Sequence, residues 1–383
     1  MMHINNREKK RVYFVPYILL IFLVVTGCAE AKIIDKLGIL VAVGYDLADE
    51  DSNDRIRTTV LSYKPGATST NTVPTSASNN TSKGVREKLS LRTSAKLVIG
   101  QMRVAAYGEP LARGGIITLT DTFQRDSEIG TSVYLVVAKD SAEQLLNAKN
   151  RQRAGTGDYL YDLLKKNIES GIVPSPTLHH FLNAYYRSGK DPILPYLEVQ
   201  GDEILISKLA LMKDDRMIGS LNLTESFSVK AMMGSNHFLT HEIELNTERL
   251  RKYYEPTFDK LYVTLSHVMT KTRIKVIDKN TPEFQVQIRL KGEMEEVSDL
   301  INLEEAEVIH ALEREAEKTL KSEFEDVMRK LQKKQVDPVG FGSHYRSSVR
   351  VQDFTAEKWR EMFKEARFVF DVKVTFVNVG ITS

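Results

Sequence analysis

Residues Leu303–Lys334, LEEAEVIHALEREAEKTLKSEFEDVMRKLQKK, form the longest periodic stretch of the 383-residue chain. Apolar side chains recur there every three or four positions, which predicts one amphipathic helix of about 48 Å. The apolar stripe consists of Ile309, Leu312, Ala316, Leu320, Phe324, Val327, Met328 and Leu331. Glutamates near the start and lysines near the end complement the helix dipole. Asp337-Pro338 is expected to end the helix.

Strand patterns lie on both sides of this helix. FQVQIRLKGEM (Phe284–Met294) and RFVFDVKVTFVNVG (Arg367–Gly380) alternate apolar and polar residues, as half-buried strands do. Antiparallel pairing is the expected arrangement for the first of them. Earlier in the chain, Ile206–Leu223 predicts two strands around a Lys-Asp-Asp-Arg turn, and Ile33–Leu47 and Arg55–Tyr63 predict another pair.

Two segments interrupt these patterns and suggest how the chain is divided. Lys64–Gly84 is dominated by Ser, Thr, Asn, Gly and Pro, and we expect a mobile surface loop because so little apolar area cannot offset the entropy of ordering. Lys190–Ile204 is broken by prolines and is interpreted as the passage between two lobes. These features predict an N-terminal domain over residues 28–200 and a C-terminal domain over 204–383. A further division near residue 297 would give three domains.

The N-terminus has the parts of a bacterial lipoprotein signal peptide. Four basic residues precede the apolar run VYFVPYILLIFLVV (Val12–Val25). This run is shorter than the roughly 20 residues that a membrane-spanning helix needs. A lipobox of branched, small, small and cysteine residues follows, formed by Val25, Thr26, Gly27 and Cys28. Cleavage after residue 27 would leave the only cysteine of the chain as a lipid-modified membrane tether. The alternative is an uncleaved anchor.

Charge and cysteine content limit the classes of function. The formal net charge of +2 falls to −1 without residues 1–27, which hold four basic residues and one acidic residue. A near-neutral chain lacks the broad basic footprint of a nucleic-acid-binding protein, so no nucleic acid partner is expected. No cysteine remains for a disulfide, and apolar cores must therefore hold the domains together.

The sequence contains no recognisable motif for catalysis or for a cofactor. The phosphate-binding loop, the dinucleotide-binding fingerprint and the nucleophile elbow of hydrolases are missing. His237 and His241 have the spacing with which one helix face can chelate a metal, but their segment fits a strand equally well and no third ligand is near. Acidic runs such as Asp214-Asp215 are typical of solvated turns. We therefore predict no catalytic residue, no metal and no cofactor.

The stretch DPVGFGSHYRSS (Asp337–Ser348) resembles a turn of the Ger(x)C family, the lipoprotein C subunits of spore germination receptors. The matching residues are Asp337, Pro338, Gly340, Phe341, Gly342, Tyr345 and Arg346. Other blocks are similar in the same order: the lipobox with LGILVAVGYD, GEPLARGGI (108–116), RDSEIGTSVYLVVAKDSAEQLL (125–146) and LALMKDDRMIGSL (209–221). Two features depart from the family pattern. Ala29-Glu30 replaces a common Trp-Asp pair, and the insert at Lys64–Gly84 is longer than usual.

The resemblance implies an α+β fold in which mixed, largely antiparallel sheets are flanked by helices. It also implies a non-enzymatic subunit on the outer face of the inner spore membrane, tethered to the bilayer through acylated Cys28. There it would assemble with two integral-membrane partners, the A and B subunits, into a nutrient-sensing receptor for spore germination.

Within the turn itself, the residue types predict a role in holding the fold. Pro338 is expected to stop the helix, and Gly340 and Gly342 to adopt positive φ and bend the chain back. Phe341 and Tyr345 would then pack the bend onto a sheet. The alternative is a role in docking a partner, which would use exposed Arg346 and His344.

Two other classes of function remain as alternatives. A lipid-anchored solute-binding protein would capture a nutrient itself, but such proteins present two α/β lobes, and this chain lacks repeated βαβ patterning. An exported hydrolase would need a nucleophile or metal constellation, which the sequence does not present.

Overall fold

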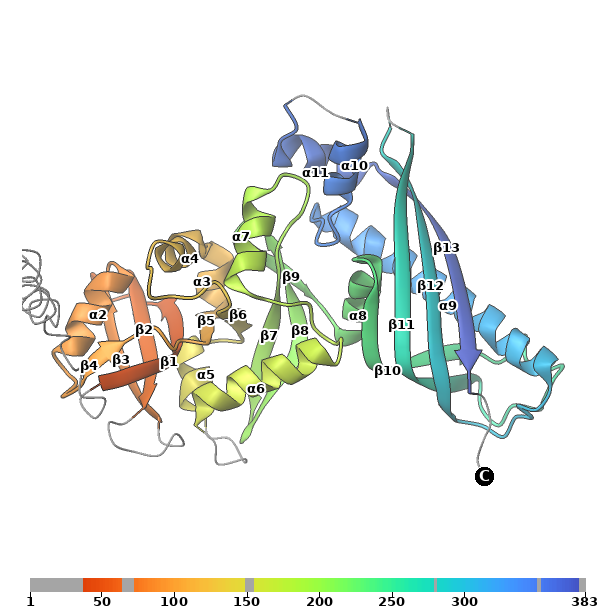
Figure 1. The fold of residues 1–383 in the computed structure, drawn as a ribbon, viewed down its shortest axis with the longest axis horizontal. Coiled ribbons are helices and arrows are strands. Elements are labelled where there is room, and N and C mark those ends of the chain that lie inside the picture. The colour runs from red at the N-terminus through yellow and green to blue at the C-terminus, as the bar shows by residue number, and fades with distance from the viewer. Residues whose placement is uncertain (1–36, 64–71, 149–154, 279–280, 350–352, 379–383) are drawn as a thin grey trace, which may run out of the picture.

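Two β-sheets form the framework of the molecule and lie side by side along its longest axis (Figure 1). The computed structural model describes residues 37–378, with the exception of 64–71, 149–154, 279–280 and 350–352. Within these residues the first sheet has nine strands and the second has four. Helices flank both sheets, and the α+β fold with mixed sheets is therefore confirmed.

The first sheet has a parallel centre and antiparallel flanks. Its strand order is β3-β2-β1-β5-β6-β7-β8-β9, and the short β4 pairs with β1. Strands β1, β5, β6 and β7 run parallel, whereas β2 and β3 on one side and β8 and β9 on the other are antiparallel to their neighbours. The strands are β1 (Leu37–Leu47), β2 (Ile56–Tyr63), β3 (Thr72–Asn79), β4 (Lys96–Val98), β5 (Val104–Gly108), β6 (Tyr134–Ala138), β7 (Ile193–Gln200), β8 (Glu203–Lys213) and β9 (Arg216–Leu221).

Helices cover both faces of the first sheet. Buried residues of α5 (Ala142–Asn147) and α6 (Thr156–Glu169) belong to one apolar core. A second core lies on the opposite face and includes residues of α2 (Ser82–Ser90), α3 (Glu109–Gly114), α4 (Ile117–Gln124) and α7 (Leu178–Tyr186). Ser141 caps α5, because its hydroxyl accepts a hydrogen bond from the backbone N–H of Gln144.

The second sheet contains β10 (Asn236–Asn246), β11 (Lys260–Asp278), β12 (Glu283–Val297) and β13 (Arg367–Val377), in that order. The predicted antiparallel pairing of β12 is confirmed for β11, while β13 lies parallel to β12 on the other side. Helices α8 (Leu223–Met232) and α9 (Ala306–Lys334) contribute to its core, together with α10 (Phe341–Val349) and α11 (Ala356–Lys364). This core is continuous with the one beneath α5 and α6, so the two sheets share one apolar interior.

Helix α9 is the predicted long helix, although it begins three residues later than expected, at Ala306. It ends at Lys334 because Gln335 adopts a left-handed conformation with φ of 54°. The prediction that Pro338 stops the helix is therefore wrong, since the helix ends before this residue is reached. Helix α8 begins with a capping box, in which Asn222 caps the helix together with Glu225.

The loop predicted over Lys64–Gly84 is wrong for its second half. Thr72–Asn79 forms β3, which pairs with β2 along its whole length, and α2 begins at Ser82. Composition misled the prediction because backbone hydrogen bonds to β2 order this segment, and they require little apolar side-chain area. Residues 64–71 lie outside the described part of the chain.

The segment Lys190–Ile204, interpreted as the passage between two lobes, contains a strand of the first sheet. Ile193–Gln200 is β7, a strand inside the first sheet that pairs with both β6 and β8. Pro195 is accommodated close to a register shift between Tyr196 and Leu197, where proline is tolerated in a sheet. The β7–β8 hairpin therefore crosses the division expected between residues 200 and 204, and the first sheet continues to Leu221.

Candidate functional site at the junction of the two sheets

The motif Asp337–Arg346 joins α9 to α10 and contacts the segment that enters β7 of the first sheet. Its second half is helical, because α10 begins at Phe341. Most residues of the motif are buried. We call the second sheet, together with helices α8 to α11, the second lobe. The motif therefore lies at the junction between the second lobe and the first sheet.

The carboxylate of Asp337 organises this junction. Only 1% of the residue is exposed. Its Oδ1 accepts a hydrogen bond from the backbone N–H of Gly340 at 2.7 Å, and its Oδ2 accepts one from the N–H of Gly342 at 2.8 Å. Oδ2 also accepts a hydrogen bond from the indole Nε1 of Trp359 at 3.1 Å. One side chain thus fixes both the loop after α9 and helix α11.

A buried ion-pair group extends from Asp337 into the first sheet. The backbone N–H of Asp337 donates to Oδ2 of Asp191 at 2.8 Å, just before β7. The other oxygen of Asp191 lies 3.0 Å from Nη2 of Arg360, which also contacts Asp214 at 2.6 Å in the β8–β9 turn. Arg360, from α11, is 8% exposed. A cation of the second lobe is therefore paired with two carboxylates of the first sheet.

Burial governs the electrostatics of this group. It raises the pKa of Asp337 to about 7, against the effect of the backbone N–H groups that donate to its carboxylate. Burial also raises the pKa of Asp191, which its hydrogen bonds and the nearby Arg360 partly offset. The pKa of Lys190, beside them, is lowered by burial. Burial thus shifts the pKa values of Asp337, Asp191 and Lys190 in the direction that favours the neutral side chain.

Two glycines allow the chain segments to approach closely. Gly340 has φ of 93°, as predicted, whereas Gly342 is not among the residues with positive φ. The role predicted for Gly342 is corrected accordingly: a Cβ there would lie 2.5 Å from Cα of Gly189 and 2.6 Å from Nε1 of Trp359. Gly342 is required for the close contact between the motif and the α7–β7 connection, and not for a turn.

Aromatic side chains surround this polar centre. Phe341 and Tyr345 are buried, and both rings contact Phe284 of β12, with centroids 5.2 Å and 6.4 Å away. The ring of Trp359 stacks on Tyr345 at 5.8 Å. The packing onto a sheet that was expected for Phe341 and Tyr345 is present in the structure. Pro338 is buried in the loop, while His344 and Arg346 are exposed on α10.

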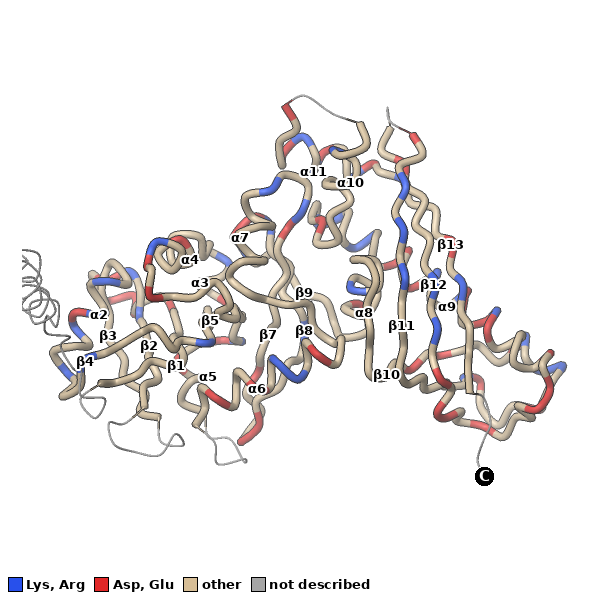
Figure 2. Tube along the Cα trace, in the orientation of Figure 1, with Lys and Arg blue, Asp and Glu red and all other residues tan. Residues whose placement is uncertain are grey.

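The second sheet also presents an exposed basic surface. Thr272 donates a hydrogen bond to the carbonyl of Ala231 in α8, so the alternating residues of β11 point away from that helix. Exposed cations occupy these positions, and we define the basic face as Lys271, Arg273, Lys275 and the adjacent Lys291 of β12. None of the four has an ion-pair partner among the described residues. Figure 2 shows the basic residues following β11 and β12.

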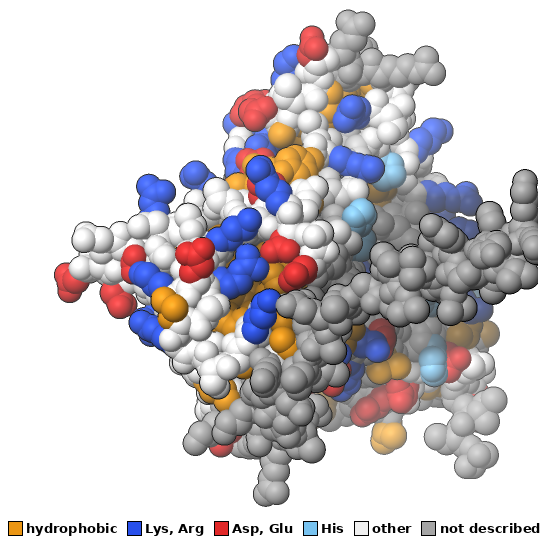
Figure 3. All heavy atoms as spheres, turned by 60° about the vertical axis from the view of Figure 1, so that its left-hand side comes forward, with side chains coloured by type: hydrophobic (Ala, Val, Ile, Leu, Met, Phe, Trp, Pro, Cys, Tyr) orange, Lys and Arg blue, Asp and Glu red, His pale blue; other side chains and the backbone are white. Residues whose placement is uncertain are grey.

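Elsewhere the charges are mixed. On the side that carries the N-terminal sheet, Figure 3 shows acidic and basic side chains interspersed with small hydrophobic areas. The basic face therefore contrasts with this side of the molecule, in a chain whose formal net charge is only +2.

The two histidines with chelating spacing lie on a strand, β10, and not on a helix. Four residues along a strand span about 13 Å, which is too far for both side chains to bind one ion. His241 instead stacks on Phe227, with centroids 3.4 Å apart, and burial lowers its pKa to about 3. In the part of the chain that the structure describes, no group of three His, Cys, Asp or Glu side chains is arranged to hold a metal.

The predicted lipobox, Val25, Thr26, Gly27 and Cys28, lies outside the described residues. Among those that are described, no helix has the length and apolar character needed to cross a bilayer.

Two family models match the chain, and they meet in the β7–β8 hairpin of the first sheet. Residues 30–199 match the spore germination protein N-terminal domain, and residues 207–380 match the C-terminal domain described as spore germination B3/GerAC like. The chain belongs to the GerAC family of spore germination proteins. It is a C-type protein of the spore germinant receptor family.

Individual members of the family are similar over most of their length. Spore germination protein GerQC of Bacillus cereus is 26% identical over 370 residues, which cover 95% of this chain and 98% of the relative. Spore germination protein KC of Bacillus subtilis (strain 168) is 21% identical over 360 residues, covering 85% and 84%. The crystal structure of the GerBC protein shares the fold with a TM-score of 0.52, at 18% identity, over 88% of this chain and 97% of that one.

The sequence alone identifies the GerAC-family motif, but not the residues of this chain that contact it. The sequence predicts no role at this site for Asp191, Trp359, Arg360 or Gly189. Trp359 is the only tryptophan of the chain, which was a usable signal. Asp191 and Gly189 carry no local signature, because they are separated from the motif by more than a hundred positions.

Proposed function

We propose that this GerAC-family protein is the lipid-anchored C subunit of a germinant receptor. The subunit stands on the outer face of the inner spore membrane and assembles there with the integral-membrane A and B subunits. It acts in nutrient-triggered germination as a non-enzymatic assembly and signalling module. The observation that carries the proposal is the single cysteine, Cys28, placed at the end of a lipobox in a chain of this family.

The proposed anchor is physically sufficient. Each buried CH₂ group contributes about 0.8 kcal/mol to membrane binding, and two acyl chains give stable attachment. Eight residues separate Cys28 from the start of β1. A chain of that length spans at most about 28 Å. The N-terminal sheet would therefore remain close to the bilayer.

The body has features that suit an assembly module. The junction around Asp337 ties the two sheets together by buried hydrogen bonds and an ion pair, which favours movement as one unit. The basic face of the second sheet offers a partner exposed cations that have no ion-pair partner within the described part of the chain. We propose that it docks on acidic segments of the membrane subunits, because complementary charge guides association and register.

Substitution of Cys28 tests the anchor. We expect Cys28→Ala to prevent acylation, to release the protein from membranes and to impair germination, while the folded body is unchanged. Thr26→Ser is the matched control, since it keeps a small residue in the lipobox and should be acylated normally. The measurements are incorporation of a clickable palmitate analogue, membrane fractionation and loss of spore refractility. If Cys28→Ala protein stays on membranes after a high-salt wash, with no lipid on residue 28, the tether is refuted.

A further inference from the structure

A cavity of about 370 Å³ lies at the junction of the two sheets. Helix α7 and the segment that enters β7 line it on the side of the first sheet, and α8 and the start of β10 line it on the side of the second lobe (Figure 1). Pro174, Pro176 and Phe181 contribute apolar walls. Binding sites for small molecules have volumes of about 300–1,000 Å³. The cavity is therefore large enough for an organic ligand that contacts both sides of the junction.

Lys230 of α8 is a buried cation in the lining of this cavity. Only 9% of the residue is exposed. Its Nζ donates to the carbonyl of Val173 at 3.0 Å and lies 5.7 Å from the ring centroid of Phe238, but it has no carboxylate partner among the described residues. Lysine is rarely buried to this degree unless an anion pairs with it, because the ammonium loses its hydration. The contact with Val173 uses one N–H group, so the other two can donate to an anion.

A second cation, Lys190, lines the cavity on the side of the first sheet. The charge of Asp337 favours its ammonium form, but burial has the larger effect and lowers its pKa. The carboxylate of Asp337 is held by the loop that follows α9. Asp191 also lines the cavity, and it is paired with Arg360. In the described part of the chain, Lys190 therefore has no ion pair of its own.

The two ammonium groups stand apart. Burial alone lowers the pKa of Lys230, to about 8, and repulsion from Lys190 makes no contribution. The lysines also come from different elements, α8 and the segment before β7. A compact dianion such as phosphate would therefore not reach both of them, and two anionic groups joined by a spacer would.

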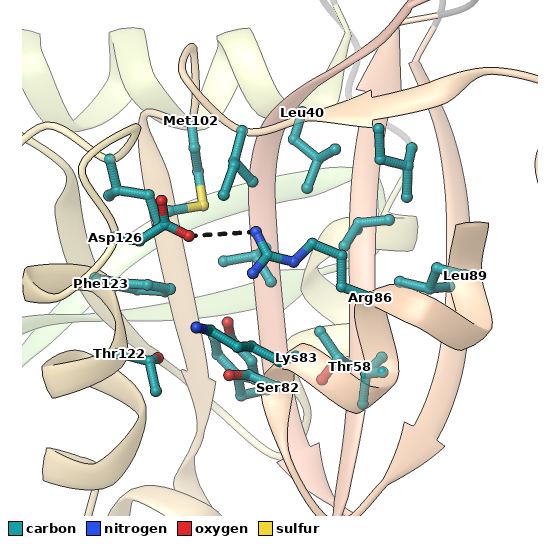
Figure 4. Close-up of a pocket in the computed structure, with 17 residues that line it drawn as sticks. Leu40, Thr58, Ser82, Lys83, Arg86, Leu89, Met102, Thr122, Phe123 and Asp126 are labelled. Carbon is teal, nitrogen blue, oxygen red and sulfur yellow. Dashed lines mark hydrogen bonds and ion pairs between the residues drawn. The ribbon is translucent and has the colours of Figure 1, made fainter.

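The smaller cavity between the first sheet and α2 has a contrasting arrangement of charges (Figure 4). Its Arg86 is paired with Asp126, and the two groups are 3.3 Å apart. Lys83, which also lines it, is exposed and keeps its hydration. These charges are satisfied without a ligand, whereas the buried ammonium of Lys230 is not.

We propose that the cavity at the junction binds a linear dicarboxylate. One carboxylate pairs with Lys230 and the other with Lys190, and the methylene chain between them lies against the apolar walls. A dicarboxylate neutralises both lysines, whereas a monocarboxylate leaves one of them without an anion. Because the lysines lie on different sides of the junction, the ligand holds the second lobe against the first sheet. This proposal goes beyond the assembly role and does not depend on the lipid anchor.

Calorimetric titration of the full chain in a non-ionic detergent tests the proposal, with succinate, glutarate, adipate and pimelate as probes. We expect saturable binding that is tightest at one chain length, because the distance between the lysines is fixed by the fold. The monomethyl ester of the tightest ligand keeps its length and loses one charge, and it should bind at least about tenfold more weakly. Inorganic phosphate should also bind at least about tenfold more weakly, since it cannot reach both lysines.

Two variants address the lysines. Lys230→Met and Lys190→Met each keep the stem of the side chain and remove its charge, and each should weaken binding of the tightest ligand about tenfold or more while the chain stays folded by circular dichroism. Arg86→Met is the matched control, because it removes a cation from the smaller cavity, and it should bind as the unaltered chain does.

Four results would overturn the proposal. They are the absence of saturable heat from every dicarboxylate up to 10 mM, equal affinity for all four chain lengths, binding of the ester or of phosphate as tight as that of the best dicarboxylate, and unchanged binding by either folded lysine variant.

Discussion

The backbone N–H of Asp337 donates to the carboxylate of Asp191 at 2.8 Å, and the N–H of Asp191 donates to the carbonyl of Asp337 at 2.9 Å. These residues are 146 positions apart in the chain. One precedes β7 in the first sheet and the other follows α9 beside the second. These reciprocal hydrogen bonds, both shielded from water, hold the family motif of the second lobe in place against the first sheet.

Close packing at this junction gives the first test. Gly342→Ala places a Cβ 2.5 Å from Cα of Gly189, and neither backbone can move without breaking hydrogen bonds. We expect it to lower the free energy of unfolding by about 1–3 kcal/mol, as overpacking does. The measurement is urea denaturation of the purified chain.

Gly114→Ala is the matched control for this test. Gly114 also lies in a helix, but a Cβ there would have no neighbour within 4 Å. Alanine should therefore stabilise the chain by about 0.5–1 kcal/mol through helix propensity. Equal shifts of the two unfolding midpoints would contradict the close contact at Gly342.

The buried ion pair gives the second test. Arg360→Met would leave Asp191, which is 5% exposed, without its cation. Removing one partner of a buried pair costs about 3–5 kcal/mol. A second substitution, Asp191→Asn, should restore part of that loss, because the amide oxygen can still accept from Asp337. Arg329→Met removes a surface pair with Asp326 and should change stability by less than about 1 kcal/mol. Additive losses in the double variant would show that Arg360 and Asp191 are not coupled.

Periodic segments of this protein were predictable from sequence, and segments ordered by distant contacts were not. The apolar stripe of α9 and the alternation in β12 are local signals that survive in the fold. The strand β3 has no such signal, because its order comes from pairing with β2. The prolines near β7 predicted a break in the secondary structure, but pairing with β6 and β8 keeps Ile193–Gln200 in a strand.

The candidate site shows the same division. Its motif could be found through resemblance to a family, and the packing of Phe341 follows from its apolar character. The reason for Gly342 could not be found, because it depends on Gly189 and Trp359, which only the folded chain brings together. The cation of Arg360 likewise finds its carboxylates only when both sheets are in place.

A glutamate of α9 gives a pH-dependent test. Burial, with repulsion from Glu244 and Asp326, raises the pKa of Glu323 to about 7, and its Oε2 has no hydrogen-bond partner among the described residues. Between about pH 4.5 and 7 the folded state therefore holds more protons here than the unfolded state does, so the stability from this group falls as pH rises. We expect Glu323→Gln to remove that loss and to stabilise the chain by about 1–2 kcal/mol at pH 8.

The measurement compares urea denaturation of both proteins at pH 5 and pH 8. The gain should shrink at the lower pH, where Glu323 is already protonated in the folded chain. Glu325→Gln, two positions away with a side chain 40% exposed, is the control and should change stability by less than about 0.5 kcal/mol at pH 8. A gain from Glu323→Gln that is the same at both pH values would contradict the raised pKa.

The basic face gives the test that bears most directly on assembly. Lys271, Arg273 and Lys275 are exposed on alternate positions of β11, so their replacement by glutamate leaves the core of the second sheet intact. If this face docks on acidic segments of the membrane subunits, reversal places like charges together and should reduce co-purification with them about tenfold or more.

The matched control reverses three exposed lysines elsewhere, Lys96, Lys165 and Lys364, and gives the same change in net charge. Recovery of the membrane subunits from detergent-solubilised spore membranes, quantified by mass spectrometry, should fall for the first triple variant only. Because surface electrostatics are screened by salt, recovery with the unaltered chain should also decrease between 50 mM and 500 mM salt. Equal recovery with the two triple variants would remove the basic face from the assembly and leave another surface of the body to account for docking.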